Sequence, residues 1–101
     1  MNELELSQRV RDYFRSLAPE VKAIRIAQSQ YSGTTGTSDW LLCIKGNFVA
    51  LELKIGDNKP TKKQDLFLRE IIDAGGISLV CYSLDEVQKK IESLLYYGPA
   101  I

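Results

Sequence analysis

The chain has 101 residues, enough for one domain with a modest core and close to the size at which oligomerisation often adds stability. Its 13 basic and 13 acidic side chains cancel, so overall charge does not indicate a nucleic-acid partner, and only a local basic patch could do so. No apolar run approaches the roughly 20 residues that cross a bilayer, and no apolar leader follows Met1, which predicts a soluble, intracellular, cytoplasmic protein without a membrane partner.

The two cysteines, Cys43 and Cys81, both lie in apolar, strand-like runs. They lack Cys-x-x-Cys spacing, and the sequence has no histidine that could complete a metal site with them. We therefore expect two buried free thiols in a reducing compartment rather than a disulfide.

The first predicted elements are a helix, a strand and a loop. Residues 2–17 have the spacing of an amphipathic helix, with an apolar stripe of Leu6, Val10, Tyr13, Phe14 and Leu17. Glu3 heads this stripe, whereas Glu5 points away from it. A first-turn glutamate also complements the helix dipole, so a purely structural role for Glu3 stays open. Residues 21–28 predict a strand, and the polar, glycine-bearing residues 29–38 predict a loop.

A β-hairpin is predicted next, because the apolar runs 40–44 and 48–53 flank a short Lys-Gly-Asn segment. With the turn centred between Gly46 and Asn47, Asp39 lies opposite Lys54, and Leu41 lies opposite Glu52. Because side chains alternate along a strand, Asp39, Glu52 and Lys54 then share one face at one end of the hairpin. The rest of both faces is mostly apolar, so we expect both strands to be buried on both sides.

The second half of the chain predicts a helix, a strand and a helix. Thr61 is the expected N-cap of a helix that runs to about Ala74, and Gln64 heads its apolar stripe of Phe67, Leu68, Ile71 and Ile72. Residues 77–82 predict a strand, and a last helix from residue 83 or 84 to 96 turns Val87, Ile91, Leu94 and Leu95 inward. The order α-β-β-β-α-β-α predicts an α/β fold, a mixed sheet flanked by helices in which the third and fourth strands are parallel.

The carboxylates at the end of the hairpin suggest a metal site. Carboxylates that converge without histidine or cysteine suit a hard cation such as Mg²⁺, and a lysine on the same face could act on a water or a phosphate. These are the groups needed for metal-assisted hydrolysis of a phosphodiester. A salt-bridged trio of Asp39, Glu52 and Lys54 is the structural alternative. Of three (Asp/Glu)-x-Lys matches, at 20–22, 52–54 and 57–59, only the middle one ends an apolar strand with an acid opposite it.

These residues resemble a known family. Asp39 followed by Val-Ala-Leu-Glu-Leu-Lys at 49–54 resembles the core of the PD-(D/E)XK nuclease superfamily. Together with Glu3, the Gly-Thr-Ser-Asp approach at 36–39 and the Thr-Lys-Lys-Gln helix start at 61–64, the chain is similar to the virus-type replication-repair nuclease (VRR-NUC) domains, relatives of Holliday junction resolvases. The resemblance covers nearly all of residues 1–101 as one domain and implies a restriction-endonuclease-like fold. One departure is Ser38, where such domains often have proline.

The resemblance implies a role for each matching residue. Asp39, Glu52 and the Leu53 carbonyl would bind Mg²⁺, or Mn²⁺ in its place. Glu3 would act through a water molecule of the metal, Lys54 on the nucleophile, and Gln64 on the position of water or phosphate.

The resemblance also implies a structure-selective DNA endonuclease that acts as a homodimer on branched DNA such as four-way junctions. Lys59, Lys62 and Lys63 could contact phosphates near the site, or they could simply be the solvated start of a helix. Two other functions fit the same pattern: a non-catalytic nucleic-acid-binding module on this fold, and a nuclease that acts on RNA.

Overall fold

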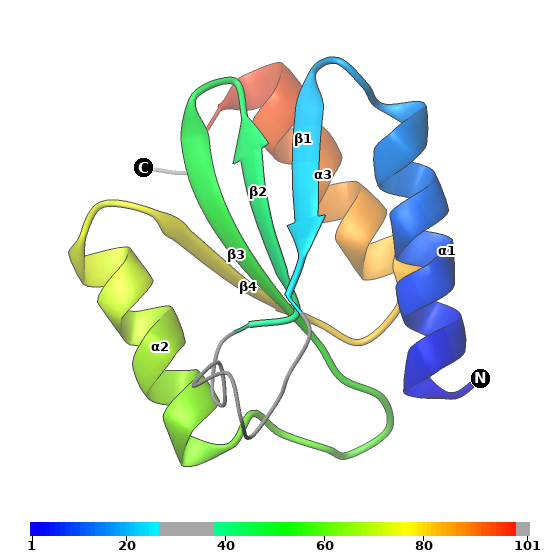
Figure 1. Cartoon of the computed structure of the whole chain (residues 1–101), viewed down its shortest axis with the longest axis vertical. Coiled ribbons are helices and arrows are strands. Elements are labelled where there is room, and N and C mark those ends of the chain that lie inside the picture. Colours follow the sequence, from blue (N-terminus) through cyan, green and yellow to red (C-terminus); the bar gives the residue numbers. More distant parts are fainter. Residues whose placement is uncertain (27–37, 99–101) are drawn as a thin grey trace.

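The computed structural model describes residues 1–26 and 38–98. Its elements follow the predicted order: α1 (Glu3–Ser16), β1 (Val21–Arg25), β2 (Trp40–Ile44), β3 (Asn47–Leu53), α2 (Lys62–Asp73), β4 (Ile77–Cys81) and α3 (Leu84–Tyr97). In these residues the strands form one sheet in the order β1-β2-β3-β4, antiparallel from β1 to β3 and parallel between β3 and β4 (Figure 1). The predicted α/β fold is confirmed. Residues 27–28 of the predicted first strand and 29–37 of the predicted loop lie outside the described residues.

The helices lie on both faces of the sheet. The hydrophobic core packs α1 and α3 against one face, and it consists of Leu6, Val10, Phe14, Val21, Trp40, Leu42, Ile44, Val49, Leu51, Leu53, Cys81, Val87, Ile91, Leu94 and Leu95. The alternate residues of β3 and β4 face α2: Glu52 bonds to Gln64 of α2, and the Ser78 hydroxyl donates to the Leu68 carbonyl at 2.7 Å. The predicted inward residues of α3 are all buried.

Each helix begins at a polar residue that satisfies one of its free backbone N–H groups. The side chains of Asn2, Thr61 and Ser83 accept from backbone N–H groups three residues later, at 2.8, 3.1 and 3.1 Å. Thr61 was the predicted N-cap, and Gln64 completes a reciprocal capping box with it. None of the helices in the described residues is long and apolar enough to cross a bilayer.

The hairpin turn differs from the predicted one by one position. The turn residues are Lys45 and Gly46, both with positive φ (49° and 84°), and Ile44 pairs with Asn47. Asn47 was expected inside the turn, but instead it begins β3, and its side-chain amide donates to the Ile44 carbonyl at 3.1 Å. The predicted pairs Asp39 with Lys54 and Leu41 with Glu52 are therefore wrong. The ladder pairs Trp40 with Leu51 and Leu41 with Ala50.

Lys45 offers a simple test of this turn. A type I′ turn needs positive φ at both central residues, which a lysine adopts at a cost of about 1 kcal/mol and which asparagine tolerates. We expect Lys45→Asn to raise the unfolding free energy by about 0.5 to 1 kcal/mol in urea denaturation. Lys45→Val is the matched contrast, because a β-branched residue is strained at this φ, and it should lower stability. Equal stability of the two variants would contradict the positive φ of residue 45 in this turn.

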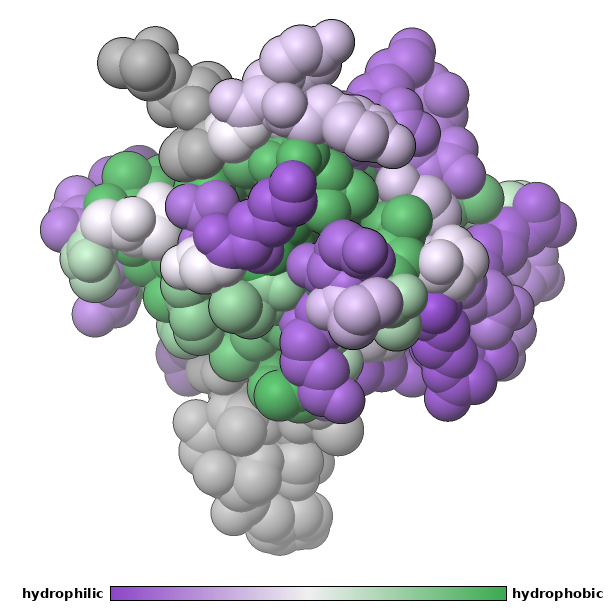
Figure 2. Space-filling view, turned by 90° about the horizontal axis from the view of Figure 1, so that it is seen from above, coloured by the Kyte–Doolittle hydropathy of each residue, from purple (hydrophilic) through white to green (hydrophobic). Residues whose placement is uncertain are grey.

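The face of the sheet opposite the main core is only half covered by the described helices. Because α2 packs over β3 and β4, Ala50 and Glu52 are buried, whereas Cys43 on β2 is exposed. The prediction that β2 is buried on both sides is therefore wrong, and so is the predicted burial of Cys43. Both cysteines are free, as predicted. Figure 2 looks onto the end of the sheet that carries the Lys45 turn and shows hydrophobic surface among polar groups there.

The predicted apolar stripe of α2 is buried only in part. Leu68 is buried, Phe67 and Ile71 are half-buried, and Ile72 is 56% exposed. Since α2 rests on two strands at the margin of the sheet, only the narrow centre of its stripe meets the sheet. The stripe was correctly placed, but its outer residue Ile72 was wrongly expected inside.

Candidate metal centre

Three carboxylates meet at the end of the sheet where β2 begins and β3 ends. Asp39 immediately precedes β2, Glu52 is the second-last residue of β3, and Glu3 is in the first turn of α1. One carboxylate oxygen of each lies within 4.8 Å of the other two. The elements that carry them come from distant parts of the chain, so this cluster exists only in the folded protein.

Asp39 is held in place from three directions. Its Oδ2 accepts from the Leu53 backbone N–H at 2.8 Å, and its carbonyl accepts from the Ile26 N–H at 2.8 Å. The preceding Ser38 is fully buried, and its hydroxyl donates to the Trp40 carbonyl at 3.1 Å. Ser38 thus fixes the backbone that leads into Asp39.

Glu52 is an acid in a fully buried position. Its Oε1 accepts from the Gln64 side-chain amide at 3.1 Å and lies 3.5 Å from the Lys54 ammonium. In the described residues its Oε2 is buried and has no hydrogen-bond partner. Burial, and then the charge of Asp39, raise the pKa of Glu52 to about 7, although the Lys54 charge works in the opposite direction.

Lys54 and Gln64 are both fixed by the backbone around them. The Lys54 N–H donates to the Cys81 carbonyl at 3.0 Å, which extends the parallel ladder by one residue, and its side chain is only 12% exposed. Gln64 Oε1 accepts from the Thr61 N–H at 2.9 Å while its Nε2 donates to Glu52. Gln64 therefore both caps α2 and orients the buried carboxylate.

The donor set fits a hard divalent cation. It offers only oxygen atoms, and the unpaired Glu52 Oε2 is a buried acceptor that a cation would satisfy. An open pocket of about 190 Å³ adjoins the cluster and is lined by two of its carboxylates and four other residues: Glu3, Asp39, Leu4, Ser7, Arg25 and Leu53. Mg²⁺ and Mn²⁺ both suit carboxylate ligands and bound water. Asp39, Glu52 and Glu3 would hold the ion, and Leu53 lines the same pocket.

The structure brings together all five residues that the sequence singled out for catalysis: Glu3, Asp39, Glu52, Lys54 and Gln64. The three lysines suggested for phosphate contacts are less closely tied to them. Lys59, Lys62 and Lys63 are exposed, in the segment that leads into α2 and in its first turn. Their side chains are free to reach solvent ions, and the described contacts do not join them to the carboxylates.

Two polar residues of the pocket were missed. Ser7 is buried and stands one helical turn after Glu3, so its polar side chain in a core-facing position was the available signal. Arg25 ends β1 beside Trp40, next to the Asp39 position. It could have been found only once β1 was paired with β2, because nothing in its local sequence is unusual.

Comparison of the chain with models of protein families, with curated proteins and with solved structures finds no match.

The first turn of α1 carries two glutamates that make a matched pair. Glu3 lies in the carboxylate cluster, while Glu5 is exposed, and both contribute similarly to the helix dipole. We expect Glu3→Gln to weaken Mn²⁺ binding by about 10-fold or more, and Glu5→Gln to leave it unchanged within about 2-fold. Isothermal titration of the three proteins with Mn²⁺ measures this. Equal losses in both variants would indicate a helix-dipole effect and remove Glu3 from the site.

Proposed function

We propose that the protein is a metal-dependent, structure-selective DNA endonuclease that hydrolyses phosphodiester bonds in branched DNA such as four-way junctions. The observation that carries this proposal is the meeting of the Glu3, Asp39 and Glu52 carboxylates, with the Lys54 ammonium 3.5 Å from Glu52 Oε1 and a buried Glu52 Oε2 that has no partner among the described residues. The resemblance of the same residues to VRR-NUC domains supports the choice of a nuclease among the possible metal-dependent hydrolases.

The residues of the site divide the chemistry between them. A divalent ion held by the carboxylates would supply positive charge that polarises a phosphate and makes water easier to deprotonate. Lys54, which lies 3.5 Å from Glu52 and is nearly buried, would orient the attacking water or offset charge that develops on the phosphate. Gln64 keeps Glu52 directed into the site, and Glu3 closes the pocket from the α1 side.

The proposal includes a homodimer in an intracellular, cytoplasmic setting. A dimer would pair two sites to cut both strands of a junction, and exposed hydrophobic side chains such as Ile24 (56%) and Phe48 (48%) support an association surface. The free thiol of the exposed Cys43 is consistent with a reducing compartment.

The experiment is incubation of the purified protein with an end-labelled four-way junction, a flap, a plain duplex and a matched RNA, each in Mg²⁺ and in Mn²⁺. We expect the junction to be cut fastest and all cutting to stop in chelator. Faster cleavage of RNA than of any of the DNA substrates would indicate that the substrate is RNA. Binding of DNA without hydrolysis in any divalent metal would leave a non-catalytic binding module and contradict the enzymatic proposal.

A further inference from the structure

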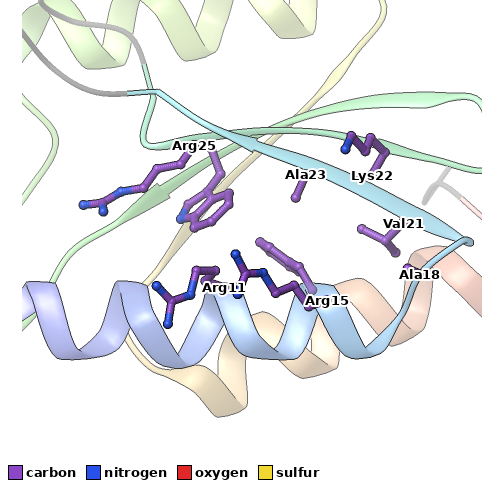
Figure 3. Close-up of a pocket in the computed structure, with 9 residues that line it drawn as sticks. Arg11, Arg15, Ala18, Val21, Lys22, Ala23 and Arg25 are labelled. Carbon is purple, nitrogen blue, oxygen red and sulfur yellow. The ribbon is translucent and has the colours of Figure 1, made fainter.

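A second pocket, separate from the carboxylates, lies between α1 and β1. It is a groove of about 390 Å³ lined by Arg11, Phe14, Arg15, Ala18, Val21, Lys22, Ala23, Arg25 and Trp40. Figure 3 shows the arginines of α1 on one side of the groove and Arg25 of β1 on the other, while the Lys22 side chain lies on the side of β1 away from α1. Four of its residues are cationic, and among the described residues no acid lines it.

The positive charge of the groove is mostly uncompensated. Arg11 has an exposed ion pair with Asp12 at 3.3 Å, and the described residues give Arg15, Lys22 and Arg25 no ion pair. The net charge of the whole chain is zero, so this is a local concentration of charge and not a general property of the surface. Arginine presents several N–H donors in a planar group that matches phosphate oxygens.

An unpaired donor lies in the wall of the same groove. Trp40 is 4% exposed, its ring packs edge-on against Phe14 with centroids 5.3 Å apart, and in the described residues its indole N–H has no acceptor. A buried donor without an acceptor is costly, and an indole nitrogen can only donate. A bound anion would satisfy it.

The groove and the carboxylate pocket border each other at Arg25. This residue lines both pockets, and its side chain extends toward the N-terminal part of α1, where Glu3 lies (Figure 3). Arg11 and Arg15 share a face of α1, and Arg15 lies about 18 Å along the helix from Glu3. Cations therefore continue away from the carboxylates over a length that accommodates several backbone phosphates.

We infer that the α1–β1 groove binds the phosphate backbone of a nucleic-acid strand while another phosphate of the same strand lies in the carboxylate site. This inference rests on the proposed function. A strand suits the groove better than a single small anion, because the cations are spread along it. The Trp40 N–H would donate to one backbone oxygen, and the arginines would contact phosphates on either side. Binding of this kind does not depend on base sequence.

The natural probe is Trp40, since it is the only tryptophan of the chain. In chelator, short single-stranded DNA and RNA oligonucleotides of the same length, and inorganic pyrophosphate, are titrated while tryptophan emission is recorded. We expect both oligonucleotides to change the emission and to bind more tightly than pyrophosphate, and the tighter of the two identifies the preferred strand. Unchanged emission at saturation, or equal affinity for pyrophosphate, would overturn the inference.

Charge-matched variants locate the binding. Arg11→Glu/Arg15→Glu changes the groove, and Arg69→Glu/Lys89→Glu changes two exposed cations on α2 and α3 by the same net charge. We expect the groove variant to bind oligonucleotides about 10-fold or more weakly than the parent at low salt. We also expect the slope of log affinity against log salt concentration to become less steep by about 1 to 2. Arg11→Gln/Arg15→Gln, which is milder for folding, should show a smaller loss of the same kind. Equal losses in groove and control variants would overturn the inference.

The same proteins separate this inference from the proposed function. If the parent cuts junction DNA and the groove variant binds and cuts equally well, the groove inference fails and the nuclease stands. If no divalent metal supports cutting while the groove variant loses binding as expected, the groove stands and the nuclease fails.

Discussion

Asp39→Asn and Glu52→Gln are each expected to reduce metal-dependent cleavage by at least about 100-fold, because each replaces a charged oxygen ligand by a neutral amide of the same shape. The substitutions keep the volume of the side chain, so the fold should survive. Their circular dichroism spectra should match that of the parent, which separates loss of chemistry from loss of structure.

The matched control for these variants is Glu92→Gln. Glu92 is an exposed acid on α3, away from the carboxylates, and its replacement changes the net charge by the same amount. We expect it to cut at the parental rate and to be stabilised by Mn²⁺ as the parent is. A folded Glu52→Gln protein that cuts like Glu92→Gln would show that the buried glutamate has no part in the chemistry.

The second large effect is on stability in the absence of metal. The pKa of Glu52 is raised from its ordinary value of 4.5 to about 7, first by burial and then by the charge of Asp39. The folded state therefore favours the protonated form of Glu52. The stability that this protonated carboxyl group adds is fully present below about pH 4.5, and it is lost as the pH rises through about 7. A rise of this size corresponds to about 3 kcal/mol.

Urea denaturation in chelator at about pH 5 and about pH 8 measures this loss. The parent should lose about 1 to 3 kcal/mol more between the two pH values than Glu52→Gln does, since the amide does not titrate. At about pH 8 the variant should be the more stable protein, although we expect it to be the less active one. A divalent metal should restore the parent's stability at high pH and leave the variant unchanged. Identical pH profiles for the two proteins would contradict the raised pKa of the buried Glu52 carboxyl group.

Much of this site was predictable because strand alternation survives an error in the turn. The turn was predicted one residue too late, so the predicted pairing of the two strands differs from the observed one by two positions. A shift of two positions keeps each side chain on the same face of the sheet, so Asp39 and Glu52 were still predicted on one face. A shift of one position would have separated them. The helix cap at Thr61 was also predictable, since capping depends on residues that are close in sequence.

What the sequence did not reveal depends on packing between distant elements. How far α2 reaches across the sheet determines that Cys43 and Ile72 are exposed, and neither local pattern contains that information. The roles of Ser7 and Arg25 likewise appear only when α1 and β1 are placed beside Asp39. Trp40 was expected to be buried with the rest of its strand, and only the packed structure shows that its indole N–H has no acceptor among the described residues.

The most direct test is a crystal structure of the parent protein grown or soaked with Mn²⁺, in which the metal is located by its anomalous scattering. We expect one peak about 2.0 to 2.4 Å from oxygen atoms of both Asp39 and Glu52, with Glu3 reached directly or through water. Well-ordered carboxylates with no peak between them, while Mn²⁺ binds elsewhere on the molecule, would contradict the metal centre on which the proposed activity depends.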